Sequence, residues 1–311
     1  MEATTILFMR RYRPAYGVAL AVHAALLLWI APADLKGRTA VAGESIVVRA
    51  VGARAIQPGE LVVLTLTTPD GVEDVRLRAF TRDVRAFREA PRTWRALVGI
   101  DLDVAPGVHA VLIEGRSANG TIRATHDLRV RPHAFATRTL KVDEAFVNPP
   151  AETQARIHRE SAELQRIWQA SAPDRLWSEP FVRPVPGEAV SRFGTRSIFN
   201  GQPRSPHSGA DFMSPTGTPI HAPNGGRVVL ARDLYFSGNT VVIDHGLGLF
   251  SLLAHLSTIA VRDGDRVSAN EIVGRVGATG RVTGPHLHWA VRASDARVDP
   301  MSVLALLGSA R

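Results

Sequence analysis

The sequence contains no cysteine, and this absence removes several kinds of chemistry at once. Disulfide bonds, zinc sites built from thiolates and cysteine nucleophiles are all excluded. We also expect no lipoprotein anchor, because no cysteine follows the apolar run near the N-terminus. A chain without free thiols is compatible with an oxidising compartment, where an unpaired thiol is a liability.

The apolar run near the N-terminus, Val18 to Ile30, is interrupted by His23 and is shorter than the roughly 20 residues that cross a bilayer. A small-residue cleavage site, Ala31-Pro-Ala33, follows the run. The run is preceded by three basic residues: Arg10, Arg11 and Arg13. Residues 1–33 are therefore predicted to be a signal peptide or an N-terminal membrane anchor, and the protein to be exported to the periplasm or cell envelope.

Acidic residues are fewer than basic ones, and the formal net charge is +8. Removing residues 1–33, which contain three Arg and one Glu, leaves +6. A basic exported protein suits an anionic partner such as a cell wall or a membrane surface. The alternative is that the charges are spread over solvated faces. No nucleic-acid-binding motif occurs, and we expect no nucleic-acid partner.

With 311 residues, of which 45% are hydrophobic, the chain can form two domains with sizeable cores. Residues 40–131 read as short strands separated by turns. Within them, Val75 to Ala79 alternates apolar residues with arginines, as a half-buried strand does. This pattern predicts an N-terminal immunoglobulin-like β-sandwich as an accessory domain. Its histidines and the one that follows it are expected to be structural: His109, His126 and His133.

Residues 132–179 are predicted to be a linker that contains a helix at 151–171. Pro149 and Pro150 suit the start of a helix, and apolar residues recur at helical spacing: Ile157, Leu164, Ile167 and Trp168. We expect this stripe to pack against a neighbouring domain. The alternative is a helix that binds a partner.

Residues 180–305 are predicted to form a second, all-β domain, which contains two histidine motifs. His207 and Asp211 are spaced H-x-x-x-D, and His286 and His288 are spaced H-x-H. Catalytic zinc takes three ligands from such side chains and leaves a fourth position for water. On a strand, residues two apart share a face, so His286 and His288 can face one site. Three of the four can therefore bind zinc, while the fourth carries out proton chemistry.

The order of motifs from about residue 180 to 300 resembles the lysostaphin/LytM-type zinc endopeptidases of peptidoglycan. Single motifs of this kind are weak signals, but the complete set in this order is specific. The matching segments are Ser191-Arg-Phe-Gly194, His207-Ser-Gly-Ala-Asp-Phe212, Gly217-Thr-Pro-Ile-His-Ala-Pro223, Gly238-Asn-Thr-Val-Val-Ile-Asp-His-Gly246, Ala254-His-Leu-Ser257 and Gly277-Ala-Thr-Gly-Arg-Val-Thr-Gly-Pro-His-Leu-His288. The sandwich and helix upstream resemble, more loosely, the accessory region of exported Gram-negative members.

The resemblance implies a LytM-type peptidase fold and one zinc ion per chain, bound by His207, Asp211 and His288. It implies that His255 and His286 assist at the scissile bond, without saying which is the general base. The expected function is zinc-dependent hydrolysis of peptidoglycan cross-links, with stem peptides as substrate. The alternative is an inactive wall-binding regulator that activates a separate amidase, and a regulatory protein partner is compatible with either function.

One residue departs from the family pattern, since Leu253 stands where the family usually has Tyr. This difference concerns the positioning of substrate. We expect His221 and His245 to be structural. The Gram-negative layout and the arginine-rich composition favour the D-Ala–diaminopimelate cross-link as substrate, because free carboxylates pair well with guanidinium groups. The arginines that we expect near the groove are Arg192, Arg196 and Arg204.

Overall fold

The computed structural model describes residues 45–141, 147–178, 180–191 and 193–309. The predicted export signal at residues 1–33 and Arg192 lie outside these ranges. The described chain is mainly β-strand with two helices, so the fold class predicted from the sequence is confirmed. None of its helices is long and apolar enough to span a bilayer.

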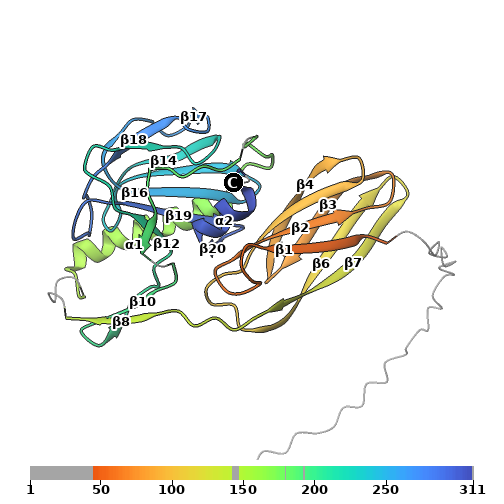
Figure 1. Ribbon diagram of the computed structural model, residues 1–311, viewed down its shortest axis with the longest axis horizontal. Coiled ribbons are helices and arrows are strands. Elements are labelled where there is room, and N and C mark those ends of the chain that lie inside the picture. Colours follow the sequence, from red (N-terminus) through yellow and green to blue (C-terminus); the bar gives the residue numbers. More distant parts are fainter. Residues whose placement is uncertain (1–44, 142–146, 179, 192, 310–311) are drawn as a thin grey trace, which may run out of the picture. The chain divides into compact units, whose positions relative to one another are not determined.

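The N-terminal strands form an antiparallel array in the order β1-β2-β5-β4-β3-β6-β7 (Figure 1). The first half of β4 pairs with β3 and its second half with β5, so β4 belongs to both layers of a sandwich. Side chains from both layers meet in one core that includes Leu64, Trp94 and Ile113. The strands are β1 (Val47–Gly52), β2 (Leu61–Thr67), β3 (Val72–Ala79), β4 (Arg82–Ala90), β5 (Thr93–Gly99), β6 (Gly107–Ser117) and β7 (Gly120–Val130).

Three short strands form a small sheet, in which a strand from the segment after the sandwich pairs with strands from the segment before the first histidine motif. β8 (Thr137–Leu140) pairs in parallel with β10 (Arg196–Phe199), and β10 pairs in antiparallel fashion with β11 (Gln202–Pro203). The linker after the sandwich therefore contributes a strand to the segment that leads into the first histidine motif.

Helix α1 (Ala151–Gln169) begins directly after Pro150, whose ring fixes φ near the helical value. Its stripe packs against β14–β16: Trp168 is buried, and its ring lies 5.2 Å from that of Phe250. Leu164 and Ile167 extend the same contact. The apolar stripe thus packs on the C-terminal sheet, the first of the two expectations from the sequence.

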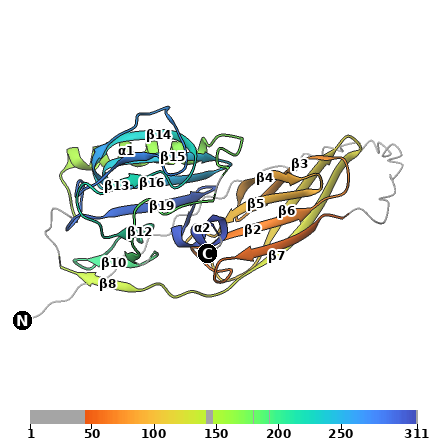
Figure 2. The ribbon, with the colours of Figure 1, turned by 45° about the horizontal axis from the view of Figure 1, so that its top comes forward.

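The C-terminal sheet runs in the order β17-β14-β15-β16-β19-β12-β9 (Figures 1 and 2). In addition, β18 pairs with β16 and β13, and β20 with β19. The elements are β9 (Ala189–Ser191), β12 (Gly209–Phe212), β13 (Pro219–His221), β14 (Gly226–Leu234), β15 (Gly238–Gly246), β16 (Leu249–Ile259), β17 (Arg266–Val267), β18 (Ile272–Val276), β19 (Leu287–Ala293), β20 (Ala296–Val298) and helix α2 (Pro300–Leu307). Trp289 and Phe212 are the largest side chains buried completely beneath this sheet.

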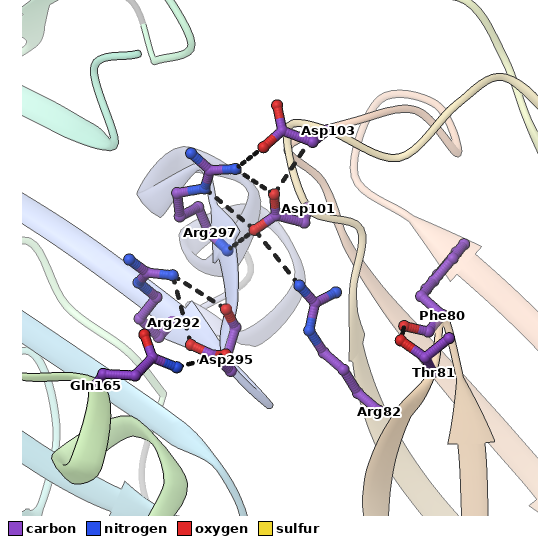
Figure 3. Close-up of polar contacts among 9 residues, drawn as sticks. All are labelled: Phe80, Thr81, Arg82, Asp101, Asp103, Gln165, Arg292, Asp295 and Arg297. Atoms are coloured by element: carbon purple, nitrogen blue, oxygen red, sulfur yellow. Dashed lines mark hydrogen bonds and ion pairs between the residues drawn. The ribbon is translucent and has the colours of Figure 1, made fainter. Parts of the chain in front are cut away.

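The sandwich and the C-terminal domain share buried polar contacts. The guanidinium of Arg297 donates to both carboxylate oxygens of Asp101, and the backbone N–H of Arg297 donates to the same group at 2.8 Å (Figure 3). The N–H of Leu61 donates to the hydroxyl of Ser302 at 2.9 Å. Gly99 lies so close to the β19–β20 hairpin that an added Cβ would stand 2.7 Å from the Cβ of Ala296. These contacts join the sandwich to the C-terminal sheet and helix α2.

Candidate metal centre

Two neighbouring strands hold the centre of the site. Asp211 on β12 and His288 on β19 are directly opposed in the antiparallel register. Ala210 and Phe212 are buried in the core, so Asp211 points to the other face of β12. Leu287 is buried in the same way, which places His288 on the face of Asp211. The alternation predicted from the H-x-H spacing is therefore present.

His207 reaches the same face from the segment before β12. Its backbone N–H donates to the carbonyl of Thr195 at 2.9 Å, and its carbonyl accepts from the N–H of Gly194 at 2.8 Å. The segment is extended and enters β12 at Gly209, as Pro206 and Gly209 indicate. The loop before β10 thus holds the first histidine against the pair on β12 and β19.

The three side chains converge on one point. His207 Nε2 lies 3.1 Å from Asp211 Oδ1 and 3.1 Å from His288 Nδ1, and His288 Nδ1 lies 2.8 Å from Asp211 Oδ1. Tetrahedral zinc ligands 2.0–2.1 Å from the ion stand about 3.3 Å apart. A slight outward movement of each group would therefore fit the ion. Among the described residues, only this group of histidine and acidic side chains could hold a metal.

The electrostatics of the cluster favour the protonation states that a metal needs. Burial alone would raise the pKa of Asp211, but hydrogen bonds from His207 and His288 outweigh it and hold that pKa well below its usual range. Burial lowers the pKa of His288, although Asp211 opposes the shift. An ionised carboxylate beside a neutral imidazole is ready to bind a cation, because metal ligands must be deprotonated.

His255 and His286 stand beside the cluster with their rings 4.8 Å apart. His255 Nδ1 lies 3.0 Å from the carbonyl of Thr279, and His286 Nδ1 lies 2.9 Å from the carbonyl of Gly284. A carbonyl oxygen can only accept, so each Nδ1 carries a proton and each Nε2 is the nitrogen available for chemistry. His286 Nε2 lies 3.9 Å from Asp211 Oδ1.

The backbone of His255 is unusual, with φ of +69°. Its N–H donates to the carbonyl of Ser237 at 2.8 Å, which holds this conformation against its steric cost. Burial and, to a smaller extent, the nearby His288 lower the pKa of His255 to about 4, against the opposing effect of the hydrogen bond to Thr279. The ring is therefore neutral near pH 7 and can accept a proton at Nε2.

Thr279 fixes this arrangement and was not predicted from the sequence. Its carbonyl binds His255, while its hydroxyl donates to the carbonyl of Leu256 at 2.8 Å and accepts from the N–H of Asn239 at 2.9 Å. Gly238 packs against it, with an added Cβ only 2.3 Å from the Thr279 carbonyl carbon. The glycine-rich segment that begins at Gly277 was the available signal, because such segments allow backbones to approach closely.

The other residues singled out in the sequence lie apart from the cluster. His245 is fully buried and binds Gly225 and Ser251, while His221 binds the carbonyl of Asn270. Leu253 is buried in the core, on β16 between β15 and β19.

The arginines and the histidines of the sandwich region are also placed by the structure. Arg196 is exposed on β10, and Arg204 is half-buried just after β11. His109 binds the carbonyl of Ala105, and the ring of His133 stacks against Phe135.

Comparison with known proteins gives one family. Residues 205–300 match peptidase family M23. The peptidoglycan DD-endopeptidase ShyA of Vibrio cholerae is 39% identical over 127 residues, which are 40% of this chain and 27% of that protein. The DD-carboxypeptidase/endopeptidase Mpg of Neisseria meningitidis is 41% identical over 97 residues, which are 31% of this chain and 22% of that protein. The chain thus spans about a quarter of the length of these relatives.

A solved structure gives a longer match. A crystal structure from Pseudomonas aeruginosa, assigned to peptidase M23, is 34% identical with a TM-score of 0.65. The match covers 81% of this chain and 96% of that one, so it includes the β-sandwich as well as the sheet with the metal centre. On this evidence the protein belongs to peptidase family M23.

Proposed function

We propose that this protein is a zinc-dependent endopeptidase that hydrolyses peptide cross-links of peptidoglycan. The observation that carries the proposal is the cluster of His207, Asp211 and His288, whose three ligand atoms converge on one point. Beside it lie His255 and His286, each with Nδ1 hydrogen-bonded to a backbone carbonyl. Two of the relatives are named as peptidoglycan DD-endopeptidase and DD-carboxypeptidase/endopeptidase, which supports the choice of substrate class.

In this mechanism His207, Asp211 and His288 hold one zinc ion. Zinc supplies Lewis acidity, which acidifies water and polarises a carbonyl group. His255 is the group we assign as general base, because burial keeps its ring neutral and Nδ1 already donates to Thr279, so Nε2 can accept a proton. The ring centres of His286 and His255 lie 4.8 Å apart. When His286 carries a second proton, on Nε2, it stabilises negative charge on the substrate oxygen.

We infer that the bond cleaved is the direct D-Ala–diaminopimelate cross-link between stem peptides rather than a bond in a polyglycine bridge. The names of the relatives and the arginine-rich composition of the chain both favour it. This substrate lies outside the cytoplasmic membrane, so we place the protein in the cell envelope. The predicted signal or anchor at residues 1–33 is consistent with that location.

Purified protein should be incubated with a cross-linked muropeptide dimer and, separately, with pentaglycine, and the products identified by mass spectrometry. We expect the dimer to be cleaved, the cleavage to stop on removal of metal with a chelator, and zinc to restore it. Cleavage of pentaglycine alone would contradict the substrate and leave the zinc mechanism in place. If zinc is bound but neither peptide is cleaved, the inactive-regulator hypothesis is favoured instead.

A further inference from the structure

The three proposed zinc ligands are not all held by the same sheet. Asp211 and His288 lie on paired strands of the C-terminal sheet. His207 instead ends a hairpin, residues 194–207, whose two sides include β10 and β11. These strands belong to the small sheet with β8 and not to the C-terminal sheet. The position of His207 therefore depends on what holds this hairpin.

The segment that follows the sandwich covers the edge of β10 that β11 leaves open (Figures 1 and 2). β8 pairs with all four residues of β10, and just before this pairing the N–H of Arg196 donates to the carbonyl of Ala136 at 2.8 Å. The start of the segment is tied to the sandwich, because the N–H of Arg131 donates to the carbonyl of Ile56 at 2.8 Å. One continuous segment thus joins the sandwich to the hairpin.

Phe135, which lies on this segment, packs against Gly194 of the hairpin. A methyl group added to Gly194 would overlap the ring of Phe135, so the ring fills the space that a side chain would take. The ring of His133 supports that of Phe135, with their centres 4.6 Å apart. Gly194 is buried, and its N–H donates to the carbonyl of His207 at 2.8 Å. The ring of Phe135 therefore contacts the residue that binds the backbone of the proposed ligand.

Phe193, the residue before Gly194, contacts the sandwich directly. A Cβ added to Gly59 would stand 2.6 Å from Cε1 of the Phe193 ring. Gly59 is itself held on both sides: its N–H donates to the carbonyl of Ile100 at 2.7 Å, and its carbonyl accepts from the N–H of Asp299 at 2.7 Å. The start of the hairpin thus rests on a fixed point of the sandwich as well as on Phe135.

These contacts lead in a short chain from the sandwich to the metal centre. Phe135 contacts Gly194, and Gly194 and Thr195 form both backbone hydrogen bonds of His207. Zinc tolerates only small changes in the positions of its ligands, since ligand distances vary by about 0.2 Å. Removing an apolar ring leaves a cavity into which the neighbouring chain can move. Loss of the ring of Phe135 would therefore loosen His207 without touching any ligand.

We propose that Phe135 is a positioning residue for the metal centre, which acts through Gly194 on His207, and that the sandwich sets the affinity for zinc through it. The inference rests on the zinc centre proposed above. It assigns to the N-terminal domain and its connecting segment a part in forming that centre. Groups that orient metal ligands without binding the ion typically contribute 10- to 100-fold to metal affinity.

The first test measures zinc affinity by competition with a chelator in the full chain. Phe135→Ala should bind zinc about 10-fold more weakly than wild type. Phe135→Leu keeps an apolar side chain and should fall between the two. The matched control is Phe80→Ala, because Phe80 is also half-buried and also packs on a histidine, His109, with ring centres 5.0 Å apart. The control should stay within about twofold of wild type. Unchanged affinity in Phe135→Ala would overturn the proposal.

Cobalt(II) in place of zinc separates ligand geometry from general loss of stability, because its visible absorption spectrum depends on the arrangement of the ligands. At saturating cobalt, Phe135→Ala should show a shifted spectrum and Phe80→Ala the wild-type spectrum. If Phe135→Ala does not fold, Phe135→Leu takes its place in the comparison. A wild-type spectrum in the Phe135 variant would mean that the ring supports only the fold, and the positioning role would be wrong.

A double-mutant cycle tests the route through Gly194. Gly194→Ala should weaken zinc binding, because its methyl group would overlap the ring of Phe135 and because Gly194 has φ of +80°. The backbone strain is the same in either background, whereas the overlap disappears in Phe135→Ala. Gly194→Ala should therefore cost less zinc affinity in Phe135→Ala than in wild type. Equal costs in the two backgrounds would exclude this route.

Hydrogen exchange of the metal-free protein tests the contact without zinc. The amides of Gly194 and His207 should lose protection in Phe135→Ala, while the amide of His255, which donates to Ser237, should keep it. Loss of protection at Gly194 and His207 in a protein whose wild type binds no zinc would refute the proposed function alone. Unchanged protection at both amides would refute the role of Phe135.

Discussion

Gly209 lies directly beneath the ring of His288. A methyl group added to Gly209 would stand 2.7 Å from both Cε1 and Nε2 of that ring and 2.5 Å from the carbonyl of Trp289. These separations are far shorter than van der Waals contact. The ring can therefore turn its Nδ1 toward Asp211 only because position 209 has no side chain.

Gly209→Ala should displace His288 and weaken zinc binding by roughly 10- to 100-fold, as supporting changes around metal ligands do. Metal content after dialysis against a graded series of chelator concentrations measures the change. Gly284→Ala is a suitable control, because nothing lies within 4 Å of a Cβ there. Equal zinc affinity in the two variants would contradict the role given to Gly209.

Removal of a proposed ligand should have a larger effect. Asp211→Ala should lose bound zinc at neutral pH, since it leaves two imidazoles to hold the ion and removes the only negative ligand. The change can be followed by elemental analysis of the purified variant. Full zinc occupancy in Asp211→Ala would show that the ligands lie elsewhere.

His255→Ala and His286→Ala should behave differently from the ligand variants. Each should retain zinc and the fold, because neither ring is needed to complete the ligand set. Each should lose about 10²- to 10⁴-fold in kcat, which is the usual contribution of a positioned acid or base. Metal analysis and kinetics on the same samples separate the two effects, and loss of zinc from either variant would make that histidine a ligand.

Sequence spacing predicted much of this site for a physical reason. His286 and His288 share a face because side chains alternate along a strand, and Leu287 is buried between them as expected. The carbonyl partners of His255 and His286 could not be predicted in the same way. They are backbone atoms of Thr279 and Gly284, and the identity of a residue says little about where its carbonyl points.

In the fold, too, local patterns were predictable from the sequence and long-range contacts were not. Local alternation predicted strands such as β3, in which Val75 and Leu77 are buried. Strand partners are set by contacts that are distant in sequence, and these were not predictable. The linker at 132–179 was expected to contain only a helix, yet residues Thr137–Leu140 form β8 and pair with β10 beside the site. Similarly, no pattern indicated that Asp101 of the sandwich would meet Arg297.

His245 should make stability depend on pH. Its Nδ1 donates to the carbonyl of Gly225, its Nε2 accepts from Ser251, and Ser251 accepts from Trp289, so the buried ring is satisfied in its neutral form. Burial lowers its pKa to about 4. The unfolded chain, with a histidine pKa near 6.5, binds more protons between these values, so stability should fall as pH falls from about 6.5 to 4.

The loss from His245 should be on the order of 3 kcal/mol at pH 4. Denaturant unfolding at several pH values measures the slope. His245→Gln removes the titrating group, so its stability should depend less steeply on pH, whatever its stability at pH 7. His221→Gln, at a partly exposed position, is the control and should retain the wild-type slope. An identical slope in His245→Gln would exclude His245 as the source.

The contact between Asp101 and Arg297 should stabilise the sandwich and the C-terminal domain together (Figure 3). Burial tends to raise the pKa of Asp101, but hydrogen bonds from Arg297 outweigh it, so the pKa is lowered and the carboxylate is charged at neutral pH. Asp101→Asn should therefore cost about 1.5–3 kcal/mol in the free energy of unfolding at pH 7.

The exposed pair of Asp70 with Arg92 provides the control for Asp101→Asn, since the Asp70 side chain is 86% exposed. Asp70→Asn should cost less than about 0.5 kcal/mol, because exposed ion pairs contribute little. The difference between Asp101→Asn and wild type should shrink as pH falls below about 4, where the wild-type carboxylate begins to take up a proton on unfolding. Urea unfolding of the three proteins at pH 7 and at about pH 2.5 measures both effects. Equal costs for the two substitutions at pH 7 would show that the interface ion pair contributes no more than a surface one.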